Sequence, residues 1–214
     1  MNIIRIASRL AAKELTSYSI FVLDQITDKM REEMDVPLDA DPYEPGTNSC
    51  VFDNTGGNIV IFSDYDAFYN TAVEAEKRNL TTIPKIYKTE KFSSGDEEEG
   101  TFSFGESAVY AAEMQKLKML NAQEGQIWQK YETSIFKEGK NPTPEDPKDA
   151  EIVNAMISLR DRSKKENVEQ TDLHAQNTAW DDEGNLRYLD LEGVNIGQAP
   201  AKAASLNINQ RHRK

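Results

Sequence analysis

The chain has 214 residues, of which 37 are acidic and 25 basic, so its formal net charge is −12. This charge argues against a nucleic-acid-binding protein, because phosphate contacts need clustered Lys and Arg side chains. The single cysteine, Cys50, excludes a disulfide framework, and two histidines leave few ligands for a histidine-based metal site. No apolar run reaches the length of a membrane span, so we expect a cytoplasmic protein without a membrane partner.

Residues 1–36 are predicted to form an N-terminal helical extension. Apolar side chains recur there at three- and four-residue spacing, first from Ile3 to Leu15 and again from Phe21 to Met34. Proline and glycine then become frequent up to Gly46, which ends the helical pattern. We therefore place a boundary after this extension.

The next region, about residues 45–113, is predicted to be a small sheet with one helix packed on it. Two short apolar segments, Ser49–Phe52 and Ile59–Phe62, flank an Asn- and Gly-rich loop, which is typical of a hairpin. A helix is expected over Tyr65–Arg78, and further strands over Lys85–Phe92 and Thr101–Glu113.

The remaining chain is predicted to be mainly helical and then irregular. Helices are expected over residues 115–137 and 148–166, with a proline-rich loop between them. Short strands and polar loops follow up to Gly193. Residues 194–214 have few large apolar side chains, so we expect a tail with little order.

Three oxygen-bearing side chains near the end of this region indicate phosphoryl-transfer chemistry. Asp172 begins a loop, Asn177 ends it, and Asp190 follows a predicted hairpin, so all three are expected at one edge. Phosphoryl transfer needs a carboxylate that orients the acceptor hydroxyl, together with hard oxygen ligands for magnesium. We therefore predict Asp172 as the catalytic residue and Asn177 and Asp190 as metal ligands.

These loops resemble the catalytic and metal-binding loops of the protein-kinase-like superfamily. The segments Asp172-Leu-His-Ala-Gln-Asn177 and Leu189-Asp-Leu-Glu-Gly193 are most similar to those of aminoglycoside-phosphotransferase-like kinases and the early protein kinases of podophages. The resemblance implies a two-lobed α+β fold over residues 45–193, with an N-lobe of about 45–113 and a reduced C-lobe of about 114–193. It also implies magnesium and ATP as cofactors.

The same resemblance implies further binding residues and a partner. Glu113 and Met114 would belong to the hinge that holds adenine, and Gly46 would lie in the loop that covers the phosphates. The activity implied is transfer of the ATP γ-phosphate to a hydroxyl of a host protein, as in the shutdown of host functions by podophage kinases. The protein would then be located in the host cytoplasm.

Two departures from the family pattern keep other functions open. The strand that carries a phosphate-binding lysine in the family has Ile61 or Phe62 at that position, and Gln170-Thr171 replaces the residues that precede the catalytic aspartate. The chain could therefore be a pseudokinase that binds or inhibits a host protein. An acidic phage structural protein or DNA mimic is a third reading, which only the net charge supports.

Overall fold

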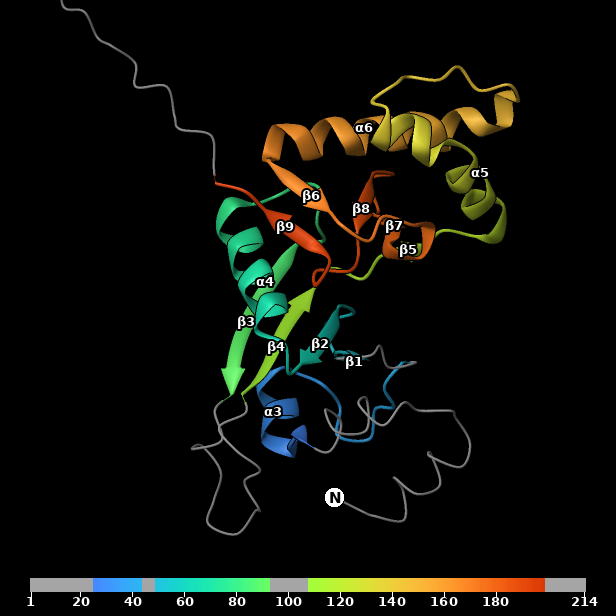
Figure 1. Cartoon of the computed structure of the whole chain (residues 1–214). Helices are drawn as coiled ribbons and strands as arrows, with labels where there is room; N and C mark the ends of the chain where they lie inside the picture. Colours follow the sequence, from blue (N-terminus) through green and yellow to red (C-terminus); the bar gives the residue numbers. More distant parts are fainter. Residues whose placement is uncertain (1–24, 44–48, 93–107, 199–214) are drawn as a thin grey trace, which may run out of the picture.

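The computed structural model describes residues 25–43, 49–92 and 108–198 as an α+β fold with antiparallel sheets (Figure 1). The expected α+β class is therefore confirmed. Gly46 lies outside the described residues, as does most of the predicted N-terminal extension. No helix in the described ranges is long and apolar enough to cross a membrane.

A four-stranded sheet forms the first half of the molecule. It contains β1 (Ser49–Asp53), β2 (Ile59–Ser63), β3 (Ile86–Phe92) and β4 (Val109–Met114), in the order β1-β2-β4-β3 with every pair antiparallel. The predicted hairpin is confirmed: the side chain of Asn54 accepts hydrogen bonds from the backbone N–H groups of Gly56 and Asn58. Gly57 supplies the positive φ of 81° that the turn requires.

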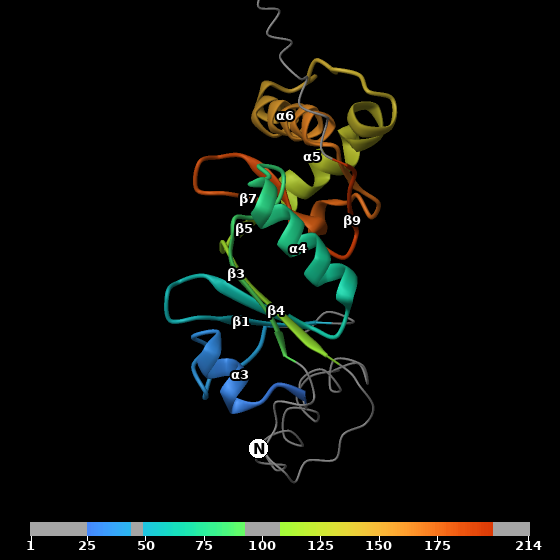
Figure 2. The ribbon, with the colours of Figure 1, turned by 90° about the vertical axis from the view of Figure 1, so that its left-hand side faces the viewer.

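Helices cover both faces of this sheet (Figure 2). On one face lies α3 (Asp28–Glu33), whose segment packs Ile26, Met30 and Met34 against buried side chains of the sheet. The other face is covered by α4 (Asp66–Arg78), which is within one residue of the predicted helix. Residues 25–36 of the predicted extension are thus part of the sheet's own core.

Alternation along β2 separates the two faces. Val60 and Phe62 pack toward α3, whereas Ile59 and Ile61 pack toward α4. Cys50 is fully buried on the α3 side, and burial raises the pKa of its thiol to about 12. It is therefore an unreactive core side chain.

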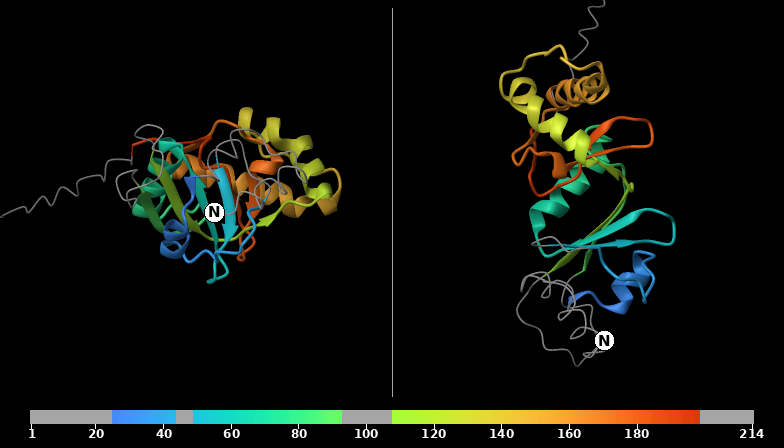
Figure 3. Two further views of the ribbon diagram at one scale, coloured as in Figure 1. Left: turned by 90° about the horizontal axis from the view of Figure 1, so that it is seen from below. Right: turned by 90° about the vertical axis from the view of Figure 1, so that its right-hand side faces the viewer.

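The second half of the molecule is mainly helical. A short strand, β5 (Lys118–Met119), leads into α5 (Ala122–Glu132), which continues as a π-helical turn over Thr133–Lys137. After a 3₁₀ turn (Pro147–Asp149), α6 (Ala150–Glu166) packs against α5. Figure 3 shows these helices at one end of the molecule and the sheet at the other. Trp128 of α5 is fully buried in the larger of the two hydrophobic clusters.

A small three-stranded sheet and a two-stranded sheet lie between the helices and the four-stranded sheet (Figure 1). β7 (Thr178–Trp180) pairs with β8 (Leu186–Tyr188) and also with β5. β6 (Val168–Gln170) pairs with β9 (Val194–Ile196). β9 lies within the segment predicted as a tail, so ordered structure continues beyond Gly193, where we had expected little order. Its apolar residues are few but they have a strand partner, which the composition of the segment alone does not indicate.

The turn after α4 is bonded to the helical half. Glu166 at the end of α6 accepts four hydrogen bonds of 2.6–3.1 Å from the backbone N–H and hydroxyl groups of Thr81 and Thr82. Arg187 of β8 donates to the carbonyls of Thr81 and Ile83, and Arg162 of α6 also donates to the carbonyl of Thr81. We call this set of contacts the Thr81–Glu166 junction.

Candidate functional site

The loop that joins β6 to β7 carries two of the three residues predicted for chemistry. Asp172 lies two residues after β6, and a 3₁₀ turn (Ala175–Asn177, η3) ends at Asn177. Nδ2 of Asn177 donates to the main-chain carbonyl of Asp172 at 3.0 Å and to its carboxylate Oδ2 at 3.2 Å. Asn177 therefore closes the loop on Asp172, which explains the spacing between them.

The third residue joins this loop through the backbone. The N–H of Leu189 donates to the carbonyl of Asn177 at 2.8 Å. The segment that carries Asp190, the next residue, therefore lies beside the end of the loop that joins β6 to β7. The Asp190 carboxylate accepts a hydrogen bond from the backbone N–H of Glu192 at 3.0 Å. The expectation that a hairpin brings Asp172, Asn177 and Asp190 to one edge agrees with these contacts.

The amide oxygen of Asn177 is the atom predicted to bind magnesium in this loop. Because Nδ2 of Asn177 donates to two acceptors, its amide orientation is fixed, and its Oδ1 accepts no hydrogen bond from any residue that the structure describes. An amide oxygen and a carboxylate, the groups that Asn177 and Asp190 carry, are hard donors of the kind that magnesium prefers. The described ranges contain no group of three or more His, Cys, Asp or Glu side chains that could hold a metal unaided.

His174 contacts the predicted catalytic carboxylate. Its Nε2 lies 3.2 Å from Oδ2 of Asp172, and 67% of the Asp172 side chain is exposed. The carboxylate is thus oriented by His174 and Asn177 while it remains open to a substrate. This contact gives His174 a part in orienting Asp172.

The predicted hinge residues lie at the end of the central strand β4. Glu113 directs its carboxylate to the β1–β2 turn, where Asn54 and Asn58 each donate to it at 2.8 Å. Met114 is fully buried, and both residues are in register with strands on each side. Their side chains therefore support the sheet, and the connection to the helical half begins at Gln115.

Two lysines stand at the N-terminal end of β3, and their ammonium groups contact the main chain of α3 and the ring of Tyr87. Lys88 donates to the main-chain carbonyl of Glu33 in α3, which puts its ammonium group on the α3 side of the sheet. Nζ of Lys85 lies 4.9 Å from the centre of the Tyr87 ring. Of Ile61 and Phe62, the two residues predicted at the position of the kinase lysine, Ile61 lies on the α4 side of β2.

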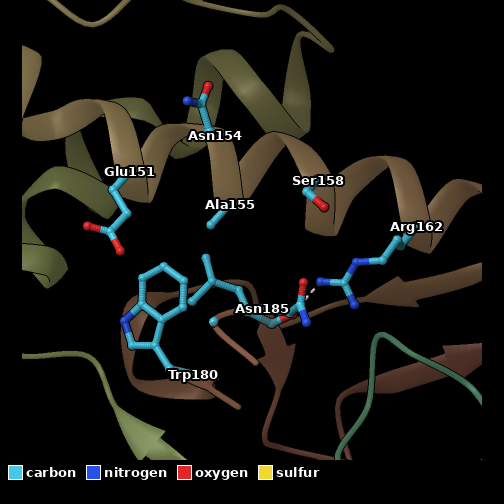
Figure 4. Close-up of a pocket in the computed structure, with 9 residues that line it drawn as sticks. Glu151, Asn154, Ala155, Ser158, Arg162, Trp180 and Asn185 are labelled. Atoms are coloured by element: carbon cyan, nitrogen blue, oxygen red, sulfur yellow. Dashed lines mark hydrogen bonds between the residues drawn. The ribbon is translucent and has the colours of Figure 1, made fainter. Parts of the chain in front are cut away.

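A separate pocket of about 320 Å³ lies between α6 and the β7–β8 turn (Figure 4). Asn154, Ala155 and Ser158 of α6 form one wall, and Trp180 and Asn185 lie opposite them. At its end, Nη2 of Arg162 donates to the carbonyl of Leu186 at 2.6 Å. None of the residues predicted for catalysis lines this pocket, so it is distinct from the Asp172 edge.

One residue of the site was not recognised as such from the sequence. Gln170 stands two positions before Asp172, and its side chain contacts both the Asp172 and the Asp190 segments. The sequence marked this position only as a departure from the family pattern.

Neither a comparison with protein-family models nor one with curated proteins found a match for this chain.

Proposed function

We propose that the chain is a protein-kinase-like phosphotransferase, which transfers the γ-phosphate of magnesium-bound ATP to a hydroxyl of a host protein. The observation that carries the proposal is the bonding of Asn177, which joins Asp172 on one side and the Leu189–Asp190 segment on the other. This arrangement supplies a base and two metal-ligand oxygens at one edge. The sheet and the helical part would be the two lobes.

In this proposal each side chain has one task. Asp172 accepts a hydrogen bond from the acceptor hydroxyl and takes up its proton, while His174 and Asn177 hold the carboxylate in place. Asn177 and Asp190 would hold magnesium, which would neutralise the charge that develops on the phosphates. The main chain around Glu113 and Met114, together with Gly46, would contact the nucleotide.

A nucleotide-binding and transfer experiment tests the proposal. We expect Mg²⁺-ATP to raise the melting temperature of the wild-type chain, because a ligand at 100 times its Kd stabilises a protein by about 2.7 kcal/mol. Asp172→Asn should lower phosphate transfer to a generic protein acceptor on the order of 10²- to 10⁴-fold. Asp190→Asn should abolish the magnesium-dependent melting shift.

Asp182→Asn is the matched control, because Asp182 is an exposed residue in the β7–β8 turn and the charge change is the same. It should behave as wild type in both assays. A wild-type chain that gains no stability from Mg²⁺-ATP and transfers no phosphate would contradict the proposal.

A pseudokinase is the second candidate, and Ile61 is the observation that favours it. An apolar side chain stands on the α4 side of β2 where the family has a lysine that holds the phosphates. The chain would then act by binding a host protein. Retention of that protein by the Asp172→Asn variant, with no nucleotide binding by the wild type, would favour this second function.

A further inference from the structure

Gln170 connects the two loops that carry the predicted chemistry. It is the last residue of β6, and only 8% of it is exposed. Its Nε2 donates to the main-chain carbonyl of Asp190 at 3.0 Å, and its Oε1 accepts from the backbone N–H of Asp172 at 3.2 Å. One buried amide thus spans from the base to the metal ligand.

The amide side chain of Gln170 satisfies both groups at neutral pH. The contact to Asp190 needs a donor and the contact to Asp172 needs an acceptor, and a glutamine has one of each at its end. A glutamate would offer acceptors alone, and a leucine would leave the part-buried N–H of Asp172 and carbonyl of Asp190 without this partner.

Gly193 leaves the space that Gln170 occupies. A Cβ atom at Gly193 would collide with Oε1 of Gln170 and lie 3.0 Å from Oδ2 of Asp190. Gly193 is not among the glycines with positive φ, so its backbone conformation does not require a glycine. Its carbonyl accepts from the N–H and hydroxyl of Thr171 at 2.8 and 2.9 Å, which holds it against the catalytic loop.

We propose that Gln170 is a positioning residue that fixes Asp190 relative to Asp172 before magnesium and nucleotide bind, with Gly193 keeping the space free. The inference rests on the proposed phosphotransferase function. It assigns to Gln170 an effect on metal binding that acts through Asp190. Residues that orient a metal ligand typically change metal affinity or activity 10- to 100-fold when they are replaced.

The Gln170→Glu variant tests the donor arm alone. The introduced carboxylate keeps an acceptor for the Asp172 N–H but has no donor for the Asp190 carbonyl. At neutral pH we expect the Mg²⁺ concentration for half-maximal phosphate transfer to rise about 10- to 100-fold. Binding of Mn²⁺ in the presence of ATP, measured by electron paramagnetic resonance, should weaken by a similar factor.

The pH profile separates positioning from a general loss of structure. When the introduced carboxyl group is protonated it regains a donor, so the Mg²⁺ requirement of Gln170→Glu should approach that of wild type as pH falls. Wild type at each pH is the reference. Glu169→Gln is the matched control, because Glu169 is the exposed neighbour on the same strand, and it should leave the requirement unchanged.

Gly193→Ala is the second variant and keeps the test valid if Gln170→Glu does not fold. Its methyl group should displace Gln170 and raise the Mg²⁺ requirement at every pH. Folded variants that retain the wild-type Mg²⁺ requirement and Mn²⁺ affinity would overturn the positioning role alone. A wild-type chain without any magnesium-nucleotide binding would instead overturn the proposed function on which the role rests.

Discussion

At the scale of single residues, Asp181 illustrates how this acidic chain places a carboxylate in its interior. Its side chain is 0% exposed and pairs with Nε of Arg187 at 2.6 Å. It also accepts backbone hydrogen bonds from Glu183 and Asn185. Burial raises the pKa of Asp181, but the Asn185 and Arg187 hydrogen bonds outweigh burial, and the net pKa is below its usual value.

Asp181→Asn should destabilise the protein by about 3 kcal/mol at pH 7, because it leaves the buried Arg187 charge without its partner. Folding lowers the pKa, so the ionised carboxylate stabilises the protein at pH values above its unfolded-state pKa of about 3.9. This stabilisation is lost as the pH falls below that value. The gap between variant and wild type in urea unfolding should therefore narrow below about pH 4. Asp182→Asn, the exposed neighbour, should cost little at any pH.

The residues proposed for catalysis form a pattern in the linear sequence, whereas the contacts that support them do not. Asp172, Asn177 and Asp190 follow one another at spacings that the loop and hairpin impose, so a linear pattern contains them. Gln170 acts through contacts to residues 2 and 20 positions away, and the longer of these depends on the pairing of β6 with β9. Glu113 was expected at the nucleotide, but its carboxylate contacts a turn 55 and 59 residues earlier.

At the scale of elements, the Thr81–Glu166 junction holds the end of α4 to the end of α6. Thr82 is fully buried, and its hydroxyl donates to Oε2 of Glu166 at 2.7 Å. Burial raises the pKa of Glu166, but the hydrogen bonds from Thr81 and Thr82 lower it by more than burial raises it. The net pKa is below the usual value, so the carboxylate stays ionised.

Thr82→Val keeps the volume of the side chain and removes this donor. We expect a loss of about 1–3 kcal/mol, since the bond is to a charged group. Thr81→Val should lose less, because the junction is exposed there. Hydrogen exchange would check the element involved: protection in the last turn of α4 should fall more than protection in α5. Uniform loss across all helices would contradict a local role.

The start of α5 gives a second prediction at this scale. The side chain of Asn121 accepts hydrogen bonds from the N–H groups of Gln123 and Glu124, and the Glu124 carboxylate accepts one from the N–H of Asn121. Together these bonds form a complete capping box. Asn121→Ala should lower the free energy of unfolding by about 1 kcal/mol in denaturant titration. Gln123→Ala, at the second residue of the helix, is the control and should leave the free energy of unfolding nearly unchanged.

Periodicity identified the longer elements but not the short ones. The 13 residues of α4 and the 17 of α6 bury one face each, so an apolar stripe at helical spacing is visible in the sequence. The strands β6 and β9 have three residues each, too few for a two-residue alternation to be distinguished from a loop. They exist because they pair with each other, which no local pattern encodes.

At the scale of the whole molecule, the proposed phosphotransferase would hold phosphates from the α4 side of β2. Ile61 stands there without a charge, so we expect Mg²⁺-ATP to bind weakly in the wild type. Ile61→Lys should raise the affinity for Mg²⁺-ATP about tenfold or more, while the half-buried ammonium lowers the melting temperature of the unliganded protein.

Isothermal titration calorimetry with and without magnesium would measure the change. Tyr87→Lys adds the same charge at an exposed position of β3 and should leave the affinity near that of wild type. An equal gain in both variants would show that the net charge, rather than the position of the lysine, determines nucleotide affinity.

The pairing of β3 with β4 also bears on how the gene for this protein could be engineered. Phe92 and Val109 are opposed partners at the end of that ladder, so their Cα atoms are about 5 Å apart. The connection between them, residues 93–108, therefore begins and ends at neighbouring positions of the sheet. A flexible linker of twice that length should cost only about 0.6 kcal/mol in closure entropy. A fluorescent protein whose own termini are adjacent could be inserted there, with thermal unfolding of the host domain as the check, and would report on the sheet from within a single polypeptide.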